Sequence, residues 1–323
     1  MNKSFSLTAK LGILLVLAVV FGATLIALSA RAPHREHVSN YFDNSPDDTK
    51  KIHESFSVAS GGELYLDSDL GDVEVTGTDG SEVSLDVTIE GSSRDMDRFN
   101  VEYSQDGNNV RVSGRGEKKY FQLWNNNGLS VRYELRVPKQ YNLRVSTAGG
   151  NVVLTGLEGS LQGETSGGDL DLTDLSGTMK MHTSGGNIML RNVSGDLYAE
   201  TSGGNIHGER VSGTTRVETS GGNITFRDSD GKLSASTSGG DIRVSMTDNK
   251  GIDLSTSGGS ISLTLPKAVT ANVQAETTGG DVTCDFTFAG KLRDGSLNGT
   301  INGGGSLVRA ETSGGDIIIN AAE

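Results

Sequence analysis

Acidic side chains recur at 18-residue intervals and are the first candidates for chemistry. The column comprises Glu164, His182, Glu200, Glu218, Glu276 and Glu311. If consecutive repeats stack, neighbouring carboxylates such as Glu200 and Glu218 could chelate a cation or act as a general acid/base pair. No cluster of Arg and His accompanies the column in the sequence, so solvated positions beside a turn are the favoured interpretation. The sequence therefore predicts no catalytic residue, no metal site and no cofactor.

An aromatic segment is the second candidate. Tyr120 and Phe121 precede the single tryptophan, Trp124, and a run of asparagines follows. Aromatic faces with polar neighbours suit the binding of sugars or peptides. The same side chains could instead cover one end of a repeat stack, which needs a cap because an open end is a sheet edge. Tyr120, Phe121 and Trp124 are thus candidate ligand-binding residues, and the capping role is favoured.

Other residues at repeat spacing have structural interpretations. Arg191, Glu209 and Arg227 alternate in sign and predict a ladder of charges across neighbouring strands. A column of threonines could suggest ice binding, but each is followed by a Ser-Gly-Gly turn and is expected to point inward. The column consists of Thr165, Thr183, Thr201, Thr219 and Thr237.

Cysteine and histidine provide little further chemistry. Cys284 is the single cysteine, so there is no disulfide framework, and its position predicts a small buried hydrophobic residue. His34 and His37 are close in sequence, but two ligands in a flexible segment do not make a metal site.

Pairs of glycines place all these residues in a repeating framework. From Gly149 to Gly240 each pair is followed by Asn or Asp and then by an aliphatic residue. Self-similarity at a fixed period predicts a stack of equal structural units. The first glycines of the pairs, which we expect to form turns, are Gly149, Gly167, Gly185, Gly203, Gly221, Gly239, Gly258, Gly279 and Gly314.

One repeat shows how a coil is built. Ile188 and Leu190 alternate with polar residues, Gly195 follows at a turn, and Leu197 and Ala199 alternate again. This pattern predicts two half-buried strands per coil, parallel to those of the next coil and about 4.8 Å from them. We expect positive φ at the recurring glycine of the second corner, together with burial of the repeated aliphatic columns. The predicted fold is all-β: a parallel β-helix, or β-solenoid, of 18-residue coils and right-handed.

A left-handed hexapeptide helix would need an aliphatic residue every six positions. Ser194 and Glu200 follow Ile188 at those positions, so this alternative fails. The period loosens after Gly240, and the interval from Gly279 to Gly314 is expected to hold about two coils.

The N-terminal residues predict export. Lys3 and Lys10 precede an uncharged apolar run from Leu11 to Leu28, which fits an uncleaved single-span anchor or a cleaved signal peptide. We favour the anchor, an N-terminal hydrophobic helix. The predicted organisation is a signal segment over 1–28, a flexible linker over 29–54, an irregular β cap over 55–145 and solenoid repeats over 146–323.

The combination of features resembles a known family. An apolar export segment, an irregular β start, Leu-Arg-Val-Pro138-Lys139 and tandem Thr-Ser-Gly-Gly-Asn/Asp-Ile repeats resemble the bacterial putative-adhesin β-strand-repeat family, a domain of unknown function. That family is similar to the β-helical head domains of autotransporter adhesins. The resemblance covers roughly residues 55–323. It implies a surface or envelope location and no established catalytic residues.

Two functions follow as hypotheses. The first is a non-catalytic envelope protein, membrane-tethered or else secreted or periplasmic, that acts as an adhesin-like interaction or scaffold surface. The alternative is an extracytoplasmic polysaccharide lyase or hydrolase on the same fold. The net charge of −13 argues against nucleic acid. Expected partners are the membrane through the N-terminal helix, an envelope glycan or protein, and another copy joined end to end.

Overall fold

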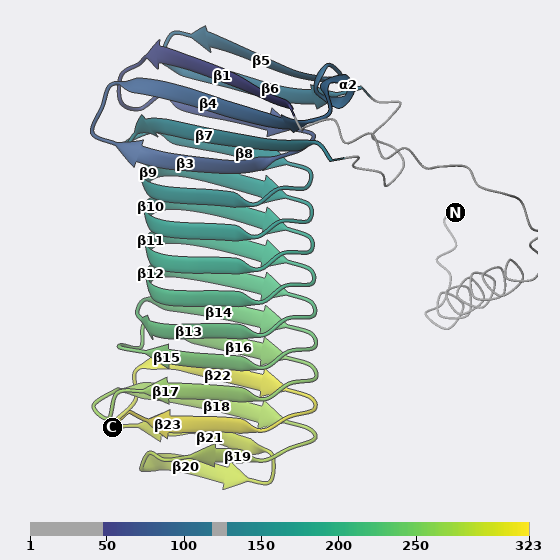
Figure 1. Cartoon of the computed structure of the whole chain (residues 1–323). Helices are drawn as coiled ribbons and strands as arrows, with labels where there is room; N and C mark the ends of the chain where they lie inside the picture. The colour runs from purple at the N-terminus through teal and green to yellow at the C-terminus, as the bar shows by residue number, and fades with distance from the viewer. Residues whose placement is uncertain (1–47, 118–127, 323) are drawn as a thin grey trace, which may run out of the picture. The chain divides into compact units, whose positions relative to one another are not determined.

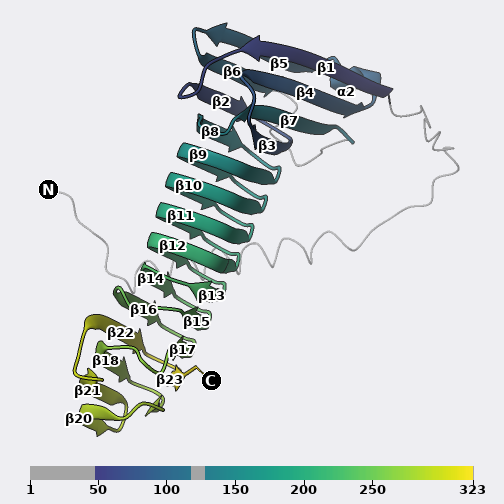
Figure 2. The same cartoon turned by 90° about the vertical axis from the view of Figure 1, so that its left-hand side faces the viewer.

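The computed structural model describes residues 48–117 and 128–322. The regular secondary structure in these ranges consists almost entirely of β-strands (Figure 1). The strands stack as rungs in two columns that enclose one hydrophobic core (Figure 2). The predicted all-β class and the repeating strand stack are confirmed. We call the stack that contains β14 (Lys232–Thr237) and β16 (Ile252–Thr256) column 1 and the stack that contains β13 (Ile224–Ser229), β15 (Ile242–Met246) and β17 (Ile261–Leu265) column 2.

Four long strands form the middle of the stack: β9 (Val152–Thr165), β10 (Leu170–Thr183), β11 (Ile188–Thr201) and β12 (Ile206–Thr219). Each bends once, so its first half lies in column 2 and its second half in column 1. The strands are parallel, and each residue pairs with the one 18 positions later, as in Leu170, Ile188 and Ile206. The regular repeat in the sequence is therefore the regular register in space.

The next coils keep the two columns as separate strands. They are β13 (Ile224–Ser229), β14 (Lys232–Thr237), β15 (Ile242–Met246), β16 (Ile252–Thr256) and β17 (Ile261–Leu265). In column 1, β14 follows β12 and β16 follows β14, whereas in column 2 the order is β13, β15 and β17.

The bend inside each long strand depends on left-handed backbone. Gly177 and Gly195 have φ of 116° and 115°, as predicted for this corner. Three residues earlier the chain is left-handed again, at Asp174 (56°) and Asn192 (54°). Asn and Asp tolerate this conformation better than most side chains. The sequence analysis did not anticipate this second left-handed position.

The Thr-Ser-Gly-Gly turn at the other corner is bonded to the preceding coil. The Thr201 hydroxyl donates to the Gly186 carbonyl (2.8 Å) and accepts from the Gly204 amide (3.2 Å). The Asn205 amide donates to Asn187 Oδ1 one coil away (2.9 Å). Thr165, Thr183 and Thr219 repeat the threonine contacts. The inward position of the threonine column agrees with the prediction, and the Asn/Asp column is bonded from coil to coil.

The two glycines of each pair have different constraints. A Cβ on Gly204 would lie 1.9 Å from the Gly186 carbonyl oxygen, whereas a Cβ on Gly203 would have its nearest neighbour at 3.7 Å. The first glycines named from the sequence do lie in the turns of the described chain. The close approach between the backbones of neighbouring coils, however, occurs at the second glycine, where any side chain would separate the coils.

The core consists of the predicted aliphatic columns, and the side-chain sizes in neighbouring coils complement each other. Ile188, Ile206 and Ile224 are buried one above another. Gly208 stands where the coil on either side has Leu190 and Phe226, and the Phe226 ring occupies the space that a Gly208 side chain would need. Large and small residues therefore interdigitate along the stack.

The N-terminal rungs do not follow chain order. β2 (Glu63–Ser68) and β3 (Asp72–Thr78) form a coil that lies between two coils from later in the chain. Its neighbours are β6 (Asn109–Gly116) with β7 (Ser130–Pro138), and β8 (Asn142–Thr147) with β9. Because β2 and β3 share both columns and the core with the repeats, the predicted boundary between residues 145 and 146 does not separate two bodies.

Antiparallel strands close this end. They are β1 (Asp48–Ser57) and β4 (Glu82–Gly91) in column 2, and β5 (Phe99–Asp106) in column 1, with the short α2 (Ser93–Met96) between β4 and β5. The predicted linker over 29–54 is wrong at its end, because β1 begins at Asp48. As an edge strand with one paired side and little burial, β1 carries the polar composition that predicted a linker.

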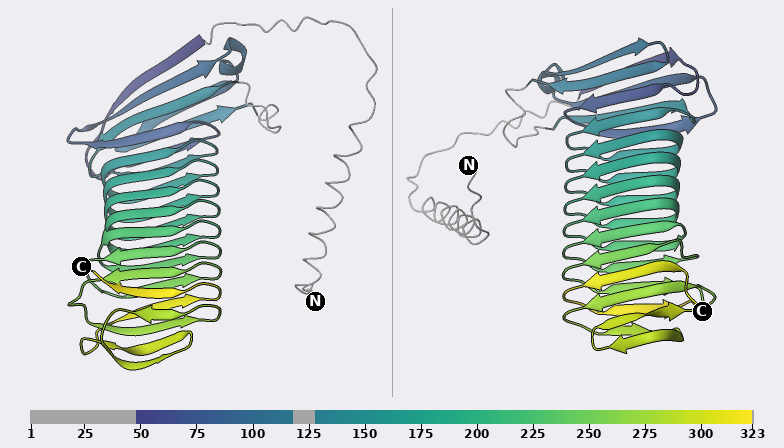
Figure 3. Two further views of the ribbon diagram at one scale, coloured as in Figure 1. Left: turned by 60° about the horizontal axis from the view of Figure 1, so that its bottom comes forward. Right: turned by 180° about the vertical axis from the view of Figure 1, so that it is seen from behind.

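The C-terminal rungs are also out of chain order. β22 (Ser306–Thr312) and β23 (Ile317–Ala321) insert between β16 with β17 and β18 (Ala271–Thr277) with β19 (Val282–Cys284). Figure 1 shows these yellow strands between green ones. The last rungs of column 1 are the antiparallel β20 (Phe288–Arg293) and β21 (Ser296–Ile301), as Figure 3 also shows. The expectation of two further coils between Gly279 and Gly314 is therefore wrong, because this interval contains a hairpin.

Several predicted features lie outside the described residues. They are the apolar segment over 1–28, His34 and His37, and the candidate ligand-binding residues Tyr120, Phe121 and Trp124. Of the helices in the described ranges, none has the length and apolar character that a membrane span requires.

Candidate binding face

The outward face of column 1 carries two parallel lines of side chains, because its strands are in register and every second residue points out. We call the first the basic line. It contains, rung by rung, Arg111, Tyr65, Arg144, Gln162, Lys180, Tyr198, Arg216, Ser234, Asp253, Arg309 and Gln274.

The second line, two residues further along each strand, is called the acidic line. It contains Ser113, Asp67, Ser146, Glu164, His182, Glu200, Glu218, Ser236, Ser255, Glu311 and Glu276. The predicted carboxylate column is thus brought together on consecutive rungs from Glu164 to Glu218, and again at Glu311 and Glu276.

The carboxylates of this line have close polar partners. Glu218 accepts from Arg216 Nε at 2.6 Å, and Glu311 accepts from Arg309 Nε at 2.8 Å. Glu200 accepts from the Tyr198 hydroxyl at 2.9 Å. Single arginines therefore accompany two carboxylates of the column, although the sequence shows no cluster of Arg and His beside it. The Arg-x-Glu spacing in the strands could have revealed these pairs from the sequence.

Tyr198 is the most perturbed group in the middle of the face. Burial raises the pKa of Tyr198 to about 12, and its hydrogen bond to Glu200 and the nearby Glu218 charge add to the effect. The phenol therefore stays protonated near neutral pH and remains a donor to the carboxylate. His182 Nδ1 lies 3.7 Å from Glu200 Oε2 on the opposite side.

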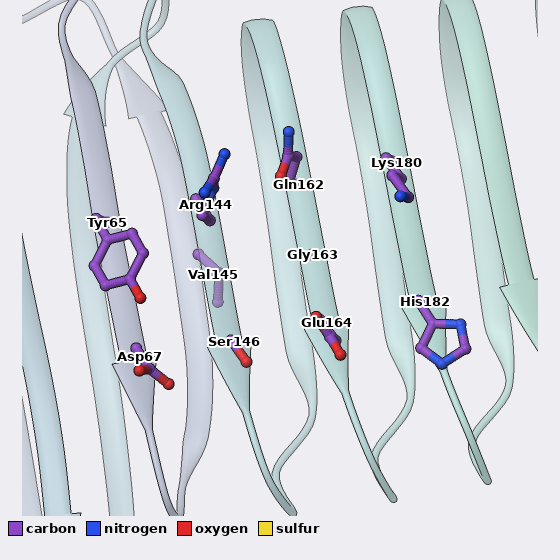
Figure 4. Close-up of a pocket in the computed structure, with 10 residues that line it drawn as sticks. All are labelled: Tyr65, Asp67, Arg144, Val145, Ser146, Gln162, Gly163, Glu164, Lys180 and His182. Carbon is purple, nitrogen blue, oxygen red and sulfur yellow. The ribbon is translucent and has the colours of Figure 1, made fainter.

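A shallow depression of about 360 Å³ lies on this face across β2, β8, β9 and β10 (Figure 4). The side chains that line it are Tyr65, Asp67, Arg144, Ser146, Gln162, Glu164, Lys180 and His182, together with Val145 and Gly163. Its lining is predominantly polar and combines cations, carboxylates and neutral hydrogen-bonding groups.

The upper border of the depression is fixed by two arginines of β6. The Arg111 guanidinium lies over the Tyr65 ring, 4.4 Å from the centroid, which is a cation–π geometry. Arg115 forms ion pairs with Asp67 and, at 3.1 Å, with Asp69. Asp67 is therefore neutralised by a neighbouring side chain.

The cations along the basic line fall into two groups. Arg216 and Arg309 each pair with the carboxylate two residues later. Arg144 and Lys180 are followed at that spacing by Ser146 and His182, and no carboxylate of the described chain forms an ion pair with either cation. The positive charge available for a ligand is thus concentrated at the depression.

The remaining sequence-based candidates have structural roles. Arg191, Glu209 and Arg227 do lie side by side, but Arg191 pairs with Asp171 (3.1 Å) and Glu209 with Arg210. The predicted ladder is therefore right in position and different in its ion pairs.

Cys284 is partly buried, in the last strand of column 2, and burial raises the pKa of its thiol. The predicted full burial is wrong because β19 has a paired strand on one side only. Within 48–117 and 128–322, no three or more His, Cys, Asp or Glu side chains gather as a possible metal site.

The chain is similar to solved structures from species of Bacteroides and Parabacteroides. A putative adhesin from Bacteroides fragilis NCTC 9343 is 15% identical, with 84% of this chain and 97% of that chain covered and a TM-score of 0.41. A putative lipid binding protein from Parabacteroides distasonis ATCC 8503 is 17% identical, covering 85% and 97%, with a TM-score of 0.41. A putative adhesin from the same organism is 15% identical, covering 83% and 97%, with a TM-score of 0.39.

No curated protein matches the sequence. Residues 62–320, in contrast, match the family described as Toastrack DUF4097. The match spans the out-of-order rungs at both ends as well as the strict repeats between them. It also confirms the predicted resemblance to a β-repeat family of unknown function. The chain therefore belongs to the Toastrack DUF4097 family.

Proposed function

We propose that the protein is a non-catalytic interaction surface of the cell envelope, an adhesin-like or scaffold protein built on a right-handed β-solenoid. The apolar segment from Leu11 to Leu28 would tether it to the membrane or direct its secretion, with the β-stack outside the cytoplasm. One observation carries the proposal. It is the long outward face of column 1, on which charged and hydrogen-bonding side chains stand at a fixed spacing.

The physical support is preorganisation. Side chains on paired strands are held by the backbone register, so a ligand that matches the spacing loses little of its binding energy to ordering the protein. The face is also wide and shallow, which suits an extended partner better than a small enclosed substrate.

A second candidate is a polysaccharide-active enzyme. It is supported by Glu164, His182 and Glu200, which occupy consecutive rungs beside the depression. Such enzymes use carboxylates on either side of the scissile bond. Here Glu200 accepts a hydrogen bond from Tyr198, which stabilises the carboxylate as an acceptor and favours a structural role.

Binding and cleavage can be separated with one preparation. The full chain in mild detergent would be applied to arrays of envelope glycans, cell-wall fragments and surface proteins, and positive glycans would then be assayed for new reducing ends. The proposal expects binding without cleavage, and the same binding for Glu200→Gln. Cleavage that Glu200→Gln abolishes would overturn it in favour of the enzyme.

Localisation has its own test. Ser238, an exposed residue next to a Gly-Gly turn, would be changed to Cys in a Cys284→Ser background. The proposal expects labelling of intact cells by a membrane-impermeant maleimide. The Cys284→Ser chain without the new cysteine is the control. Labelling only after cell lysis would contradict an extracytoplasmic location.

A further inference from the structure

The upper part of the basic line alternates cations with neutral groups. From β6 to β10 the successive rungs carry Arg111, Tyr65, Arg144, Gln162 and Lys180. Rungs are about 4.8 Å apart, so equivalent cations recur at about 10 Å. Between them stand a phenol and an amide, both neutral hydrogen-bonding groups.

Three cations in this part of the face, Arg111, Arg144 and Lys180, form no ion pair with a carboxylate of the described residues, although the chain is strongly acidic. Arg115 pairs with both Asp67 and Asp69, and Glu63 and Glu164 also point outward beside these cations. Arg111 is held over the Tyr65 ring, and no carboxylate of the described residues forms an ion pair with it. A ligand that carries regularly spaced negative charge would therefore be attracted here.

Below Lys180 the same line is closed to such a ligand. Arg216 donates to Glu218, and Arg309 donates to Glu311. These arginines have the same outward position as Arg144, yet each is already neutralised by its own strand. The difference places the ligand at the depression and sets its lower limit between Lys180 and Arg216.

We infer that this segment binds an extended acidic glycan that alternates uronic acid with neutral sugar and runs along the stack. In a glycan with two-fold symmetry, every second sugar presents the same side, so its carboxylates recur at the disaccharide repeat. Arg111, Arg144 and Lys180 bind those carboxylates, and the Tyr65 hydroxyl and the Gln162 amide contact the neutral sugars between them. The inference rests on the proposed interaction function and names its ligand class.

The alternation favours a glycan over a phosphate polymer. Sugars between the charged residues offer hydroxyl groups to Tyr65 and Gln162, whereas a polyol phosphate chain would leave these side chains without specific partners.

The test uses the full chain in mild detergent and a size series of hyaluronan oligosaccharides, with binding measured by calorimetry. Carboxyl-reduced hyaluronan and poly(glycerol phosphate) are the comparison probes. We expect Arg144→Gln and Lys180→Gln each to weaken hyaluronan binding about tenfold. Arg216→Gln is the matched control and should change it less than about twofold, because Glu218 already occupies that arginine.

A variant that should gain binding provides the more discriminating test. Glu218→Gln frees Arg216 and extends the row of available cations by one disaccharide repeat. It should strengthen binding of long oligosaccharides several-fold and leave short ones unchanged. A uniform effect on all lengths would overturn the assignment, as would equal losses from Arg216→Gln and Arg144→Gln.

The probes distinguish the inference from the proposed function. Equal binding of carboxyl-reduced hyaluronan or of poly(glycerol phosphate) would overturn the acidic-glycan assignment. If hyaluronan fails while a protein or a neutral glycan from the arrays binds, the inference is wrong and the interaction function stands. If no probe or array component binds, both are wrong.

Discussion

The middle and the ends of the stack are built from the same kind of rung but assembled differently. From β9 to β12 each coil lies on the coil that precedes it in the chain, and every residue pairs with the one 18 positions away. At the N-terminal end the β2–β3 coil lies between two later segments, and at the C-terminal end β22–β23 lies between two earlier ones.

The difference teaches that a repeat predicts contacts only while neighbours in sequence are neighbours in space. In the middle, losing a coil removes one unit of a one-dimensional stack. At the ends, an interior rung comes from a segment that is distant in the sequence. If this rung is removed, the strands that paired with it on either side lose their partner and cannot pair with each other across the gap. The free energy of unfolding should therefore depend on the ends more than the regularity of the middle suggests.

The largest expected effect compares two deletions of equal length. Ending the chain at Gly305 removes β22 and β23, which pair with β16 and β18 in column 1 and with β17 and β19 in column 2. We expect a loss on the order of 5 kcal/mol or more and unfolding of the C-terminal rungs. Thermal unfolding and limited proteolysis would measure it.

The matched control deletes residues 188–205 from the middle. β10 and β12 have equivalent residues at equivalent positions, so they can pair directly and the stack shortens by one coil. This variant should remain folded and lose far less stability than the C-terminal deletion. Equal melting temperatures for the two deletions would mean that the inserted C-terminal coil is not an interior rung.

The second prediction concerns the core of the middle region. Ile206 is 1% exposed and stacked between Ile188 and Ile224, so Ile206→Asp would bury an unpaired carboxylate. It should cost about 4 kcal/mol. His207 points outward and is half-buried, and His207→Asp should cost less than about 0.5 kcal/mol. Similar losses from both changes in urea unfolding would require a different register.

The third prediction separates two adjacent glycines of one turn. Gly204→Ala would place a Cβ 1.9 Å from the Gly186 carbonyl oxygen and force two coils apart, at a cost of about 3 kcal/mol. Gly203→Ala has open space, with its nearest atom at 3.7 Å, and should cost less than about 0.5 kcal/mol. Chemical denaturation of both variants would measure the contrast. A larger cost at Gly203 would mean that conformation, and not coil spacing, selects the pair.

Sequence reasoning predicted the middle well because its signals are local. The Gly-Gly period, the aliphatic columns such as Ile188 and Ile206, and the positive φ at Gly195 all follow from one coil and its copy. Sequence reasoning could not predict the inserted strands, because nothing in the sequence of β22 indicates that β16 and β18 are its pairing partners. Long-range pairing is decided by which edges remain open after the local coils form.

The candidate site shows the same limit. The sequence analysis identified the carboxylates Glu200 and Glu218 and missed the basic line, although Lys180, Tyr198 and Arg216 share its 18-residue spacing. Arg144 keeps the same 18-residue spacing, but Arg111 and Tyr65 could not be found from the repeat because they belong to the out-of-order rungs. Only the pairing of β6, β2 and β8 brings them into one row.

The last prediction concerns pH and the N-terminal end. Tyr133 and Tyr141 are buried there, and burial raises the pKa of each to about 12. An unfolded tyrosine releases its proton near pH 10, so the folded state holds protons that the unfolded state has lost between about pH 10 and 12. Stability is therefore complete below about pH 10 and falls as the pH rises through about 12, by up to about 3 kcal/mol for Tyr133.

Tyr133→Phe isolates one of these contributions. The Tyr133 hydroxyl lies 2.9 Å from Ser68 Oγ, so the variant should lose about 1 kcal/mol at neutral pH through the missing hydrogen bond. It should then lose less than the wild type on going to about pH 11.5, because one titrating group is gone. Urea unfolding at about pH 8 and about pH 11.5 measures both effects. An unchanged pH slope would show that alkaline unfolding begins in the repeats and not at the N-terminal rungs, which would reverse the ranking of the two regions.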